Sequence, residues 1–178
     1  MARTGTEGPG LGGTLRLTRV PDRLEHVLEH SEADETSGTW TGLACARHGL
    51  QIGSDVDNAT LIRLAGPGEI ADLVWEAPAE FEAEHGRLGM AALQAQLAGR
   101  VEEGAQLWEQ IAALWSQAWS ANCQALELMQ NAGLTRFSAA KPQRWVIASF
   151  EHHTSPHGLP HPHIHNIVIP ALTASARG

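Results

Sequence analysis

Alternating apolar and polar residues predict strands in several places along the chain. Successive side chains of a strand point to opposite faces, so a period of two marks a sheet with a buried face. The segments with this pattern, or with a short apolar run between turn residues, are Thr14–Val20, Ile70–Trp75, Arg144–Phe150 and Ile164–Ile169. Because a turn rich in Gly and Pro separates the last two, we expect them to pair as antiparallel neighbours.

Apolar residues at steps of three and four predict helices between these strands. The helical segments are Arg23–His30, Trp40–Leu50, Asp57–Leu64 and, from about Gly86 onward, the residues up to Ala132. Pro21 suits the start of the first helix, and Asp57 suits the cap of the third. Strands with helices inserted between them predict an α+β fold, a single domain around a central antiparallel sheet.

The length of 178 residues suits one domain with a sizeable core. We expect a flexible arm at residues 1–13, the folded domain at 14–173 and a frayed tail at 174–178. The sequence has no secretory signal and no apolar run long enough to span a bilayer. Cys45 and Cys123 are not a Cys-x-x-Cys pair and suit reduced thiols. The composition therefore predicts a cytoplasmic protein with no membrane partner.

Histidines are concentrated near the C-terminal strand. Six of the ten lie within the fourteen residues His152–His165. In a strand, His161, His163 and His165 would share one face, and His152 could fold back onto it. Converging imidazoles make a divalent-metal site with open coordination positions. The other interpretation is a surface tract that binds metal by accident, but the apolar residues of Ile164–Ile169 favour an ordered, buried strand.

Three blocks of the sequence resemble, in order, the N-terminal domain of the MobF-class conjugative relaxases, which belong to the HUH endonucleases. The first block is Trp40–Ala44 with Gly49–Leu50 and Asp55–Asp57, the second is Asp72–Pro78, and the third is the histidine region with Thr154, Ser155 and Pro160 in register. The third block is the most specific, because His163 and His165 follow His152 by 11 and 13 residues (163 − 152 and 165 − 152), the family's ligand spacing. The resemblance covers roughly residues 14–173.

The resemblance implies a metal site and a reaction. His152, His163 and His165 would be the ligands, and Asp72 would polarise a ligand histidine or accept the nucleophile's proton. Such relaxases hold the scissile phosphate on Mg²⁺ or Mn²⁺, although imidazole ligands also admit Zn²⁺, Co²⁺ or Ni²⁺. Attack by a tyrosine then forms a protein–DNA ester. The implied partners are single-stranded DNA at a plasmid or mobile-element transfer origin and other conjugation proteins.

The sequence contains no tyrosine. Relaxases carry their catalytic tyrosines in the segment that corresponds here to Asp22–Ser31, which contains His26 and His30. A neutral imidazole can attack phosphorus, so either histidine is a candidate nucleophile; both could equally be surface histidines. The remaining alternatives are a degenerate relaxase that binds but does not cut, and a chain from which tyrosine was removed by engineering.

The charge pattern bears on DNA binding. The net charge is −8, whereas DNA binding depends largely on Lys and Arg at phosphates. The candidate DNA contacts are Arg16, Arg19, Arg23 and Arg144. Relaxases have a lysine and an arginine where this chain has Ala79 and Pro156. These departures keep two alternatives open: a non-catalytic relaxase-like accessory module for DNA or protein, and a three-histidine metalloenzyme acting on a small molecule.

Overall fold

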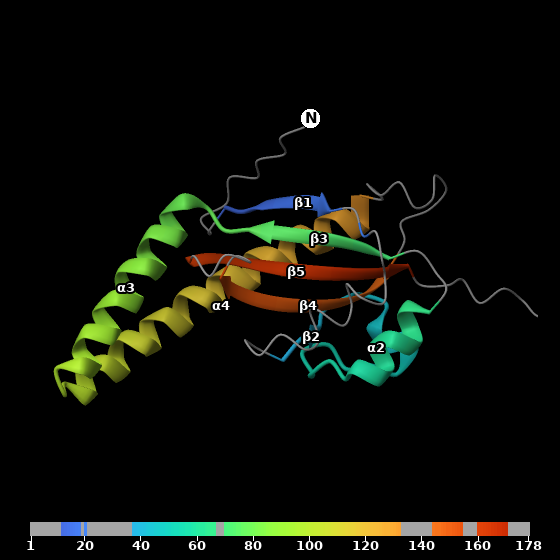
Figure 1. Ribbon diagram of the computed structural model, residues 1–178. Coiled ribbons are helices and arrows are strands. Elements are labelled where there is room, and N and C mark those ends of the chain that lie inside the picture. The colour runs from blue at the N-terminus through green and yellow to red at the C-terminus, as the bar shows by residue number, and fades with distance from the viewer. Residues whose placement is uncertain are drawn as a thin grey trace, which may run out of the picture.

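The computed structural model describes residues 12–18, 20, 37–66, 70–132, 144–154 and 160–170. Five strands form one antiparallel sheet in the order β1-β3-β5-β4-β2 (Figure 1). Their bounds are β1 Thr14–Thr18, β2 Thr39–Trp40, β3 Ala71–Glu76, β4 Trp145–Thr154 and β5 Pro160–Pro170. The predicted α+β fold with a central antiparallel sheet is confirmed, as is the pairing of the two C-terminal strands.

The helices divide the core between the two faces of the sheet. The helical elements are a 3₁₀ helix η1 Cys45–His48, α2 Asn58–Ala65, α3 Ala79–Leu97 and α4 Val101–Ala132. On one face, Trp115 and Leu126 of α4 pack in two adjoining clusters against apolar side chains of the sheet. On the other, Leu61 of α2 and Cys45 of η1 pack with Phe150 and other apolar side chains of β4 and β5. In Figure 1, α4 passes behind the sheet and α2 lies at its lower right.

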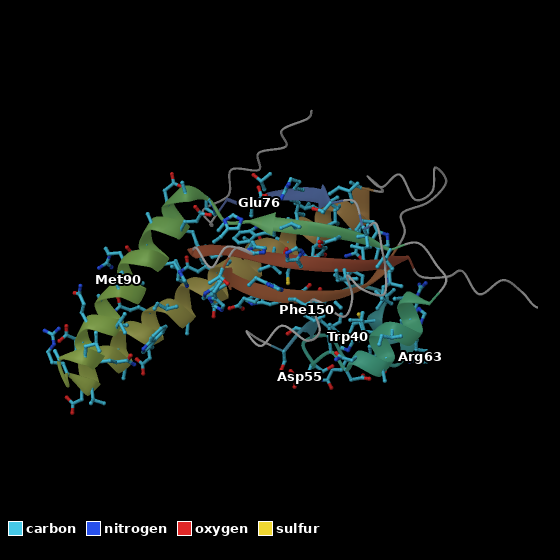
Figure 2. All side chains as sticks on the ribbon, in the orientation of Figure 1. Trp40, Asp55, Arg63, Glu76, Met90 and Phe150 are labelled. Atoms are coloured by element: carbon cyan, nitrogen blue, oxygen red, sulfur yellow. The ribbon has the colours of Figure 1, made fainter. Side chains whose placement is uncertain are left out.

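The long helical pattern forms two antiparallel helices rather than one. α3 ends at Leu97, and the chain reverses through Ala98, Gly99 and Arg100. Gly99 has a φ of 71°, a left-handed conformation that favours glycine. Gly104 faces α3 closely, because an added Cβ there would lie 3.3 Å from Cγ of Gln96, a contact tighter than most. The resulting α3–α4 hairpin projects beyond the sheet, with Met90 on its projecting part (Figure 2).

The prediction of a helix over Trp40–Leu50 is wrong at its start. Trp40 belongs to β2 and pairs with Ala148 of β4, and only Cys45–His48 form a 3₁₀ turn. Side-chain burial explains the difference, since Trp40 is 1% exposed in the core cluster that also contains Phe150; Figure 2 labels both at the lower side of the sheet. Tertiary packing therefore overrode the local pattern.

The other elements follow the sequence closely. The Asp57 side chain accepts a hydrogen bond from the Thr60 amide and caps α2, as predicted. The predicted helix Arg23–His30 and most of residues 1–13 lie outside the described part of the chain, as do residues 174–178, so these assignments stay predictions. Among the described residues, no helix is both long and apolar enough to cross a membrane.

Candidate metal centre

The pairing of β4 with β5 brings the three predicted ligand histidines together. His152 lies opposite His163, and Phe150 lies opposite His165. Because side chains alternate along each strand, all three imidazoles share the α2 side of the sheet, beyond the apolar cluster that contains Phe150. One face and one end of the sheet therefore carry the histidine cluster.

The imidazole rings are close neighbours. Ring centroids lie 5.3 Å apart for His152 and His163, 5.1 Å for His152 and His165, and 4.9 Å for His163 and His165. In the part of the chain that the structure describes, no group of three potential ligand side chains surrounds a single point. Two of the three nevertheless converge, because the Nε2 atoms of His163 and His165 are 3.1 Å apart.

Hydrogen bonds at the other ring nitrogens assign the tautomers. Nδ1 of His165 lies 2.6 Å from Oδ2 of Asp72, and Nδ1 of His163 lies 2.6 Å from the carbonyl oxygen of His161. A carbonyl or carboxylate oxygen accepts, so both Nδ1 atoms carry hydrogen. In the neutral form that a metal ligand requires, each ring presents a lone pair at Nε2, and the two lone pairs face each other. Such a pair is stabilised by a cation between them.

The distance between these nitrogens suits metal coordination. Two nitrogens at about 2.1 Å from one ion lie roughly 3.0–3.4 Å apart for right-angle or tetrahedral geometry. Burial lowers the pKa of His163, which favours the neutral ring that a metal requires. Asp72 is fully buried, and its contact with His165 is the carboxylate–histidine arrangement that orients ligands at metal sites. The residues present therefore fit a divalent ion.

The structure places the candidate DNA contacts in different regions. Arg16 lies opposite Val74, and Val74 lies opposite His165, so Arg16 is on the histidine side two strands away, roughly 10 Å across the sheet. Its guanidinium Nε is paired with Oε1 of Glu76 at 2.9 Å, and the Arg16 side chain is 63% exposed. Arg144 precedes β4 at the opposite end of the strand from His152, roughly 27 Å away along the chain. His26, His30, Arg19 and Arg23 lie outside the described residues.

Two features of the centre were not predicted from the sequence. The His161 carbonyl holds the His163 tautomer, and no sequence pattern marks a main-chain acceptor. Glu76 is the second: it pairs with Arg16 and reduces the charge available for a phosphate. Their positions at the shared end of β1, β3 and β5 become visible only once the strand register is known.

The comparisons with known proteins agree with this architecture. The family model described as TrwC relaxase matches residues 25–178. The chain belongs to the TrwC relaxase family. This membership confirms the resemblance to MobF-class relaxases. No curated protein sequence matches the chain.

Solved structures of TrwC share the fold. The conjugative relaxase TrwC in complex with oriT DNA, in metal-free form, superposes with a TM-score of 0.56 at 19% identity. The metal-bound complex with oriT DNA gives 0.56 at 18%, and TrwC with a 27-mer DNA comprising the recognition hairpin and the cleavage site gives 0.53 at 19%. Each match covers 88% of this chain and 55–56% of the TrwC chain, so this chain spans little more than half of the solved relaxase.

Proposed function

We propose that this relaxase-family domain nicks and rejoins single-stranded DNA at a transfer origin with the help of a divalent metal ion. The observation that supports the proposal best is the pair of Nε2 atoms of His163 and His165, 3.1 Å apart with both Nδ1 atoms already committed. Such an arrangement favours a cation site at the histidines that the family resemblance implies as ligands. Its alternative, a tract that binds metal by accident, does not account for a buried Asp72 aimed at one ring.

The chain's own residues would hold the ion and orient the DNA. His163 and His165 would hold the ion through their Nε2 atoms, and His152, whose ring lies beside both, would be the third ligand. When bound, Mn²⁺ or Mg²⁺ would neutralise charge on the scissile phosphate. Asp72 would keep the tautomer and the ring orientation of His165 fixed. Because Asp72 is buried behind His165, we assign it this positioning role and not the acceptance of the nucleophile's proton.

The nucleophile in this proposal is His26 or His30, since the sequence has no tyrosine. A neutral imidazole nitrogen attacks the phosphorus, and the bond from phosphorus to the 3′ oxygen breaks. The imidazole proton ends on the leaving 3′ oxygen, and the 5′ phosphate stays on the protein as a phosphoramidate. Reversal of these steps with a new 3′ hydroxyl rejoins the strand, so no external energy source is needed.

Exposed arginines would position the DNA backbone. Arg16 is on the face that carries the histidines and has a largely exposed side chain, so a phosphate can compete with Glu76 for its guanidinium. Arg19 and Arg23 follow Arg16 in the sequence and extend the same proposal. Arg144 lies at the far end of β4, so it can contribute only to a strand that crosses the whole sheet.

A second candidate function is a relaxase-like module that binds DNA or protein without cutting. The lack of tyrosine favours it, as does the start of α3, where Ala79 and Glu80 are both exposed and offer no positive charge. Under this alternative the metal site would be retained for DNA binding or stability. The two candidates differ in one product, a covalent protein–DNA adduct.

Intact-protein mass spectrometry distinguishes them. The protein is incubated with Mn²⁺ and single-stranded DNA from the transfer origin of the element that encodes it. We expect a mass increase equal to a DNA fragment, lost in His163→Ala and in one of His26→Ala and His30→Ala. His48→Ala is the matched control, because His48 is exposed in η1 on a separate part of the chain.

The remaining outcomes are equally informative. Metal binding without an adduct and without cut strands would favour the binding module. Cut strands without an adduct would identify water as the attacking group and exclude a covalent histidine intermediate. Cleavage that persists when metal is removed by a chelator would overturn the metal-dependent mechanism.

A further inference from the structure

The α3–α4 hairpin carries exposed apolar side chains in the part that projects beyond the sheet (Figure 1). Of the nine large apolar side chains that are exposed in the described part of the chain, five lie within residues 90–108 of this hairpin. They are Met90 (58% exposed), Leu93 (47%), Leu97 (80%), Val101 (74%) and Trp108 (47%). Single exposed apolar residues are ordinary on a protein surface, but a concentration of them is typical of an interaction site.

Helix geometry places three of these side chains on one side of the hairpin. Gly104 of α4 lies against Ala92 of α3, so these positions mark the sides on which the two helices face each other. Each residue turns a helix by about 100°, so Leu93, the residue after Ala92, lies about 100° round from that contact. Trp108 and Val101, on α4, lie about 40° and 60° round from Gly104 in the same rotational sense. In antiparallel helices that face each other, the same sense leads to the same side. Leu93, Val101 and Trp108 therefore form one apolar surface, which we call the hairpin strip.

Two glycines leave the backbone of α3 open beside the hairpin strip. Gly89 lies one helical turn before Leu93, and Gly86 lies one turn before Gly89. An added Cβ at either position would meet nothing within 4 Å. Glycine is unfavourable inside a helix but permits close approach of another molecule to the backbone. The hairpin strip therefore continues into a surface on which a further helix could pack closely.

The charges around the hairpin strip are acidic. Residues 79–112 contain six glutamates and only two arginines. Both arginines, Arg87 and Arg100, are paired with a glutamate three residues away. Glu102 and Glu109 are exposed and follow the two strip residues of α4, so they lie along its outer border. An apolar surface with an acidic border is complementary to a partner that is apolar in the middle and basic at its edges.

We propose that the hairpin strip binds an amphipathic helix of a partner protein, with aliphatic side chains against the strip and Lys or Arg beside Glu102 and Glu109. Such a helix in a groove between two others is a recurrent mode of peptide recognition. The surface from Gly86 to Leu97 is roughly 18 Å long, which suits a helix of about three turns. The acidic border disfavours DNA, whose phosphates it would repel, and a second copy, whose own acidic border would face it. This contact would bring a second protein to the domain at the end of the hairpin away from the sheet.

Selection from a displayed library of helical peptides of about 15 residues tests the proposal, with the full chain as the target. We expect the enriched peptides to combine a face rich in Leu or Ile with Lys or Arg beside it. Fluorescence anisotropy with an enriched peptide should show binding weakened about tenfold or more by Leu93→Glu and by Trp108→Ala. Glu102→Gln/Glu109→Gln should weaken binding several-fold and reduce its dependence on salt. Leu128→Glu is the matched control and should leave the affinity unchanged, because Leu128 is 55% exposed near the other end of α4.

Several results would overturn the proposed contact, provided that circular dichroism shows an intact fold in each variant. One is a selection that enriches no peptide, or one that enriches acidic peptides. Another is an enriched peptide that binds Leu93→Glu as tightly as the unsubstituted protein, because it would then bind elsewhere. A dimer in sedimentation that Leu93→Glu dissociates would identify a second copy as the occupant. These readouts do not involve metal binding or DNA cleavage, so the partner site and the proposed function can fail independently.

Discussion

Oδ2 of Asp72 lies 2.6 Å from Nδ1 of His165 and joins β3 to β5 on the histidine side of the sheet. Asp72 is fully buried, so its carboxylate accepts from an imidazole in surroundings where hydration cannot replace that contact. The His165 ring is therefore held with its Nε2 atom 3.1 Å from Nε2 of His163.

Replacing this carboxylate should weaken the metal site while leaving its ligands in place. We expect Asp72→Asn to lower the affinity for Mn²⁺ by about 10–100-fold, because an amide does not enforce the His165 tautomer. Isothermal titration measures this loss. Asp55→Asn, an exposed substitution, is the control. An unchanged affinity for Asp72→Asn would remove Asp72 from the metal centre.

Asn166 is a buried hydrogen-bonding hub next to His165. Its Nδ2 donates to the carbonyl of Leu73 at 2.7 Å and to Oδ1 of Asn122 at 2.9 Å. Its Oδ1 accepts from Nδ2 of Asn122 at 3.0 Å and from Oγ of Ser149 at 2.7 Å. The full bonding capacity of this amide is used, and it ties α4, β3 and β4 to β5.

Removing that hub should destabilise the fold. Asn166→Ala leaves several buried polar groups without partners, so we expect the free energy of unfolding to fall by about 3 kcal/mol. Urea unfolding followed by circular dichroism provides the measurement. Asn131→Ala, at an exposed position near the end of α4, should change stability by less than about 0.5 kcal/mol. A loss for Asn166→Ala no larger than that of the control would contradict the hub.

Gly42 lies where the chain after β2 crosses the backbone of β4. A Cβ at this position would meet the carbonyl oxygen of Trp145 at 2.2 Å and the amide nitrogen of Ile147 at 2.5 Å. Neither group can move without disrupting strand pairing, so Gly42→Ala should cost about 3 kcal/mol of unfolding free energy. Thermal and urea unfolding would measure this loss of unfolding free energy.

Gly86 offers the matched comparison with Gly42. It lies inside α3, and an added Cβ there meets nothing within 4 Å. Gly86→Ala should therefore stabilise the protein by about 0.5–1 kcal/mol, because alanine loses less backbone freedom than glycine on helix formation. Equal effects at the two positions would show that close approach is not what requires glycine at position 42.

The cap of α2 should make stability depend on acid pH. Hydrogen bonds from Thr60 lower the pKa of Asp57 below its ordinary value of 3.8. A carboxylate whose pKa is lower in the folded than in the unfolded protein stabilises the fold at pH values above its unfolded pKa. This stabilisation is lost as the pH falls from 3.8 through the folded pKa. The stability difference between the protein and Asp57→Asn, which keeps a capping oxygen without the charge, should therefore shrink over that range. A difference that is constant with pH would contradict the assignment.

Local elements follow from the sequence where one residue decides a boundary. Asp57 capped α2 as expected, and the β4–β5 pair followed from two apolar runs around a turn. Elements are hardest to predict where several segments compete for the same core position. Trp40 illustrates this, because its neighbours suggested a helix while burial against β4 made it a strand residue.

The sequence by itself determined the fold class, because periodicity is a local property, and three motifs in order determined the family, whose resemblance implied the candidate ligands. His163 and His165 share a face by strand geometry alone. Only the tertiary structure decided which hydrogen-bond acceptors fix the tautomers of these two histidines and which side chains lie beside their rings. Asp72 reaches His165 across 93 residues of sequence, and His85 reaches His153 from a separate helix. Such contacts depend on strand register and helix packing, which are set by the burial of the whole core and which no single segment encodes.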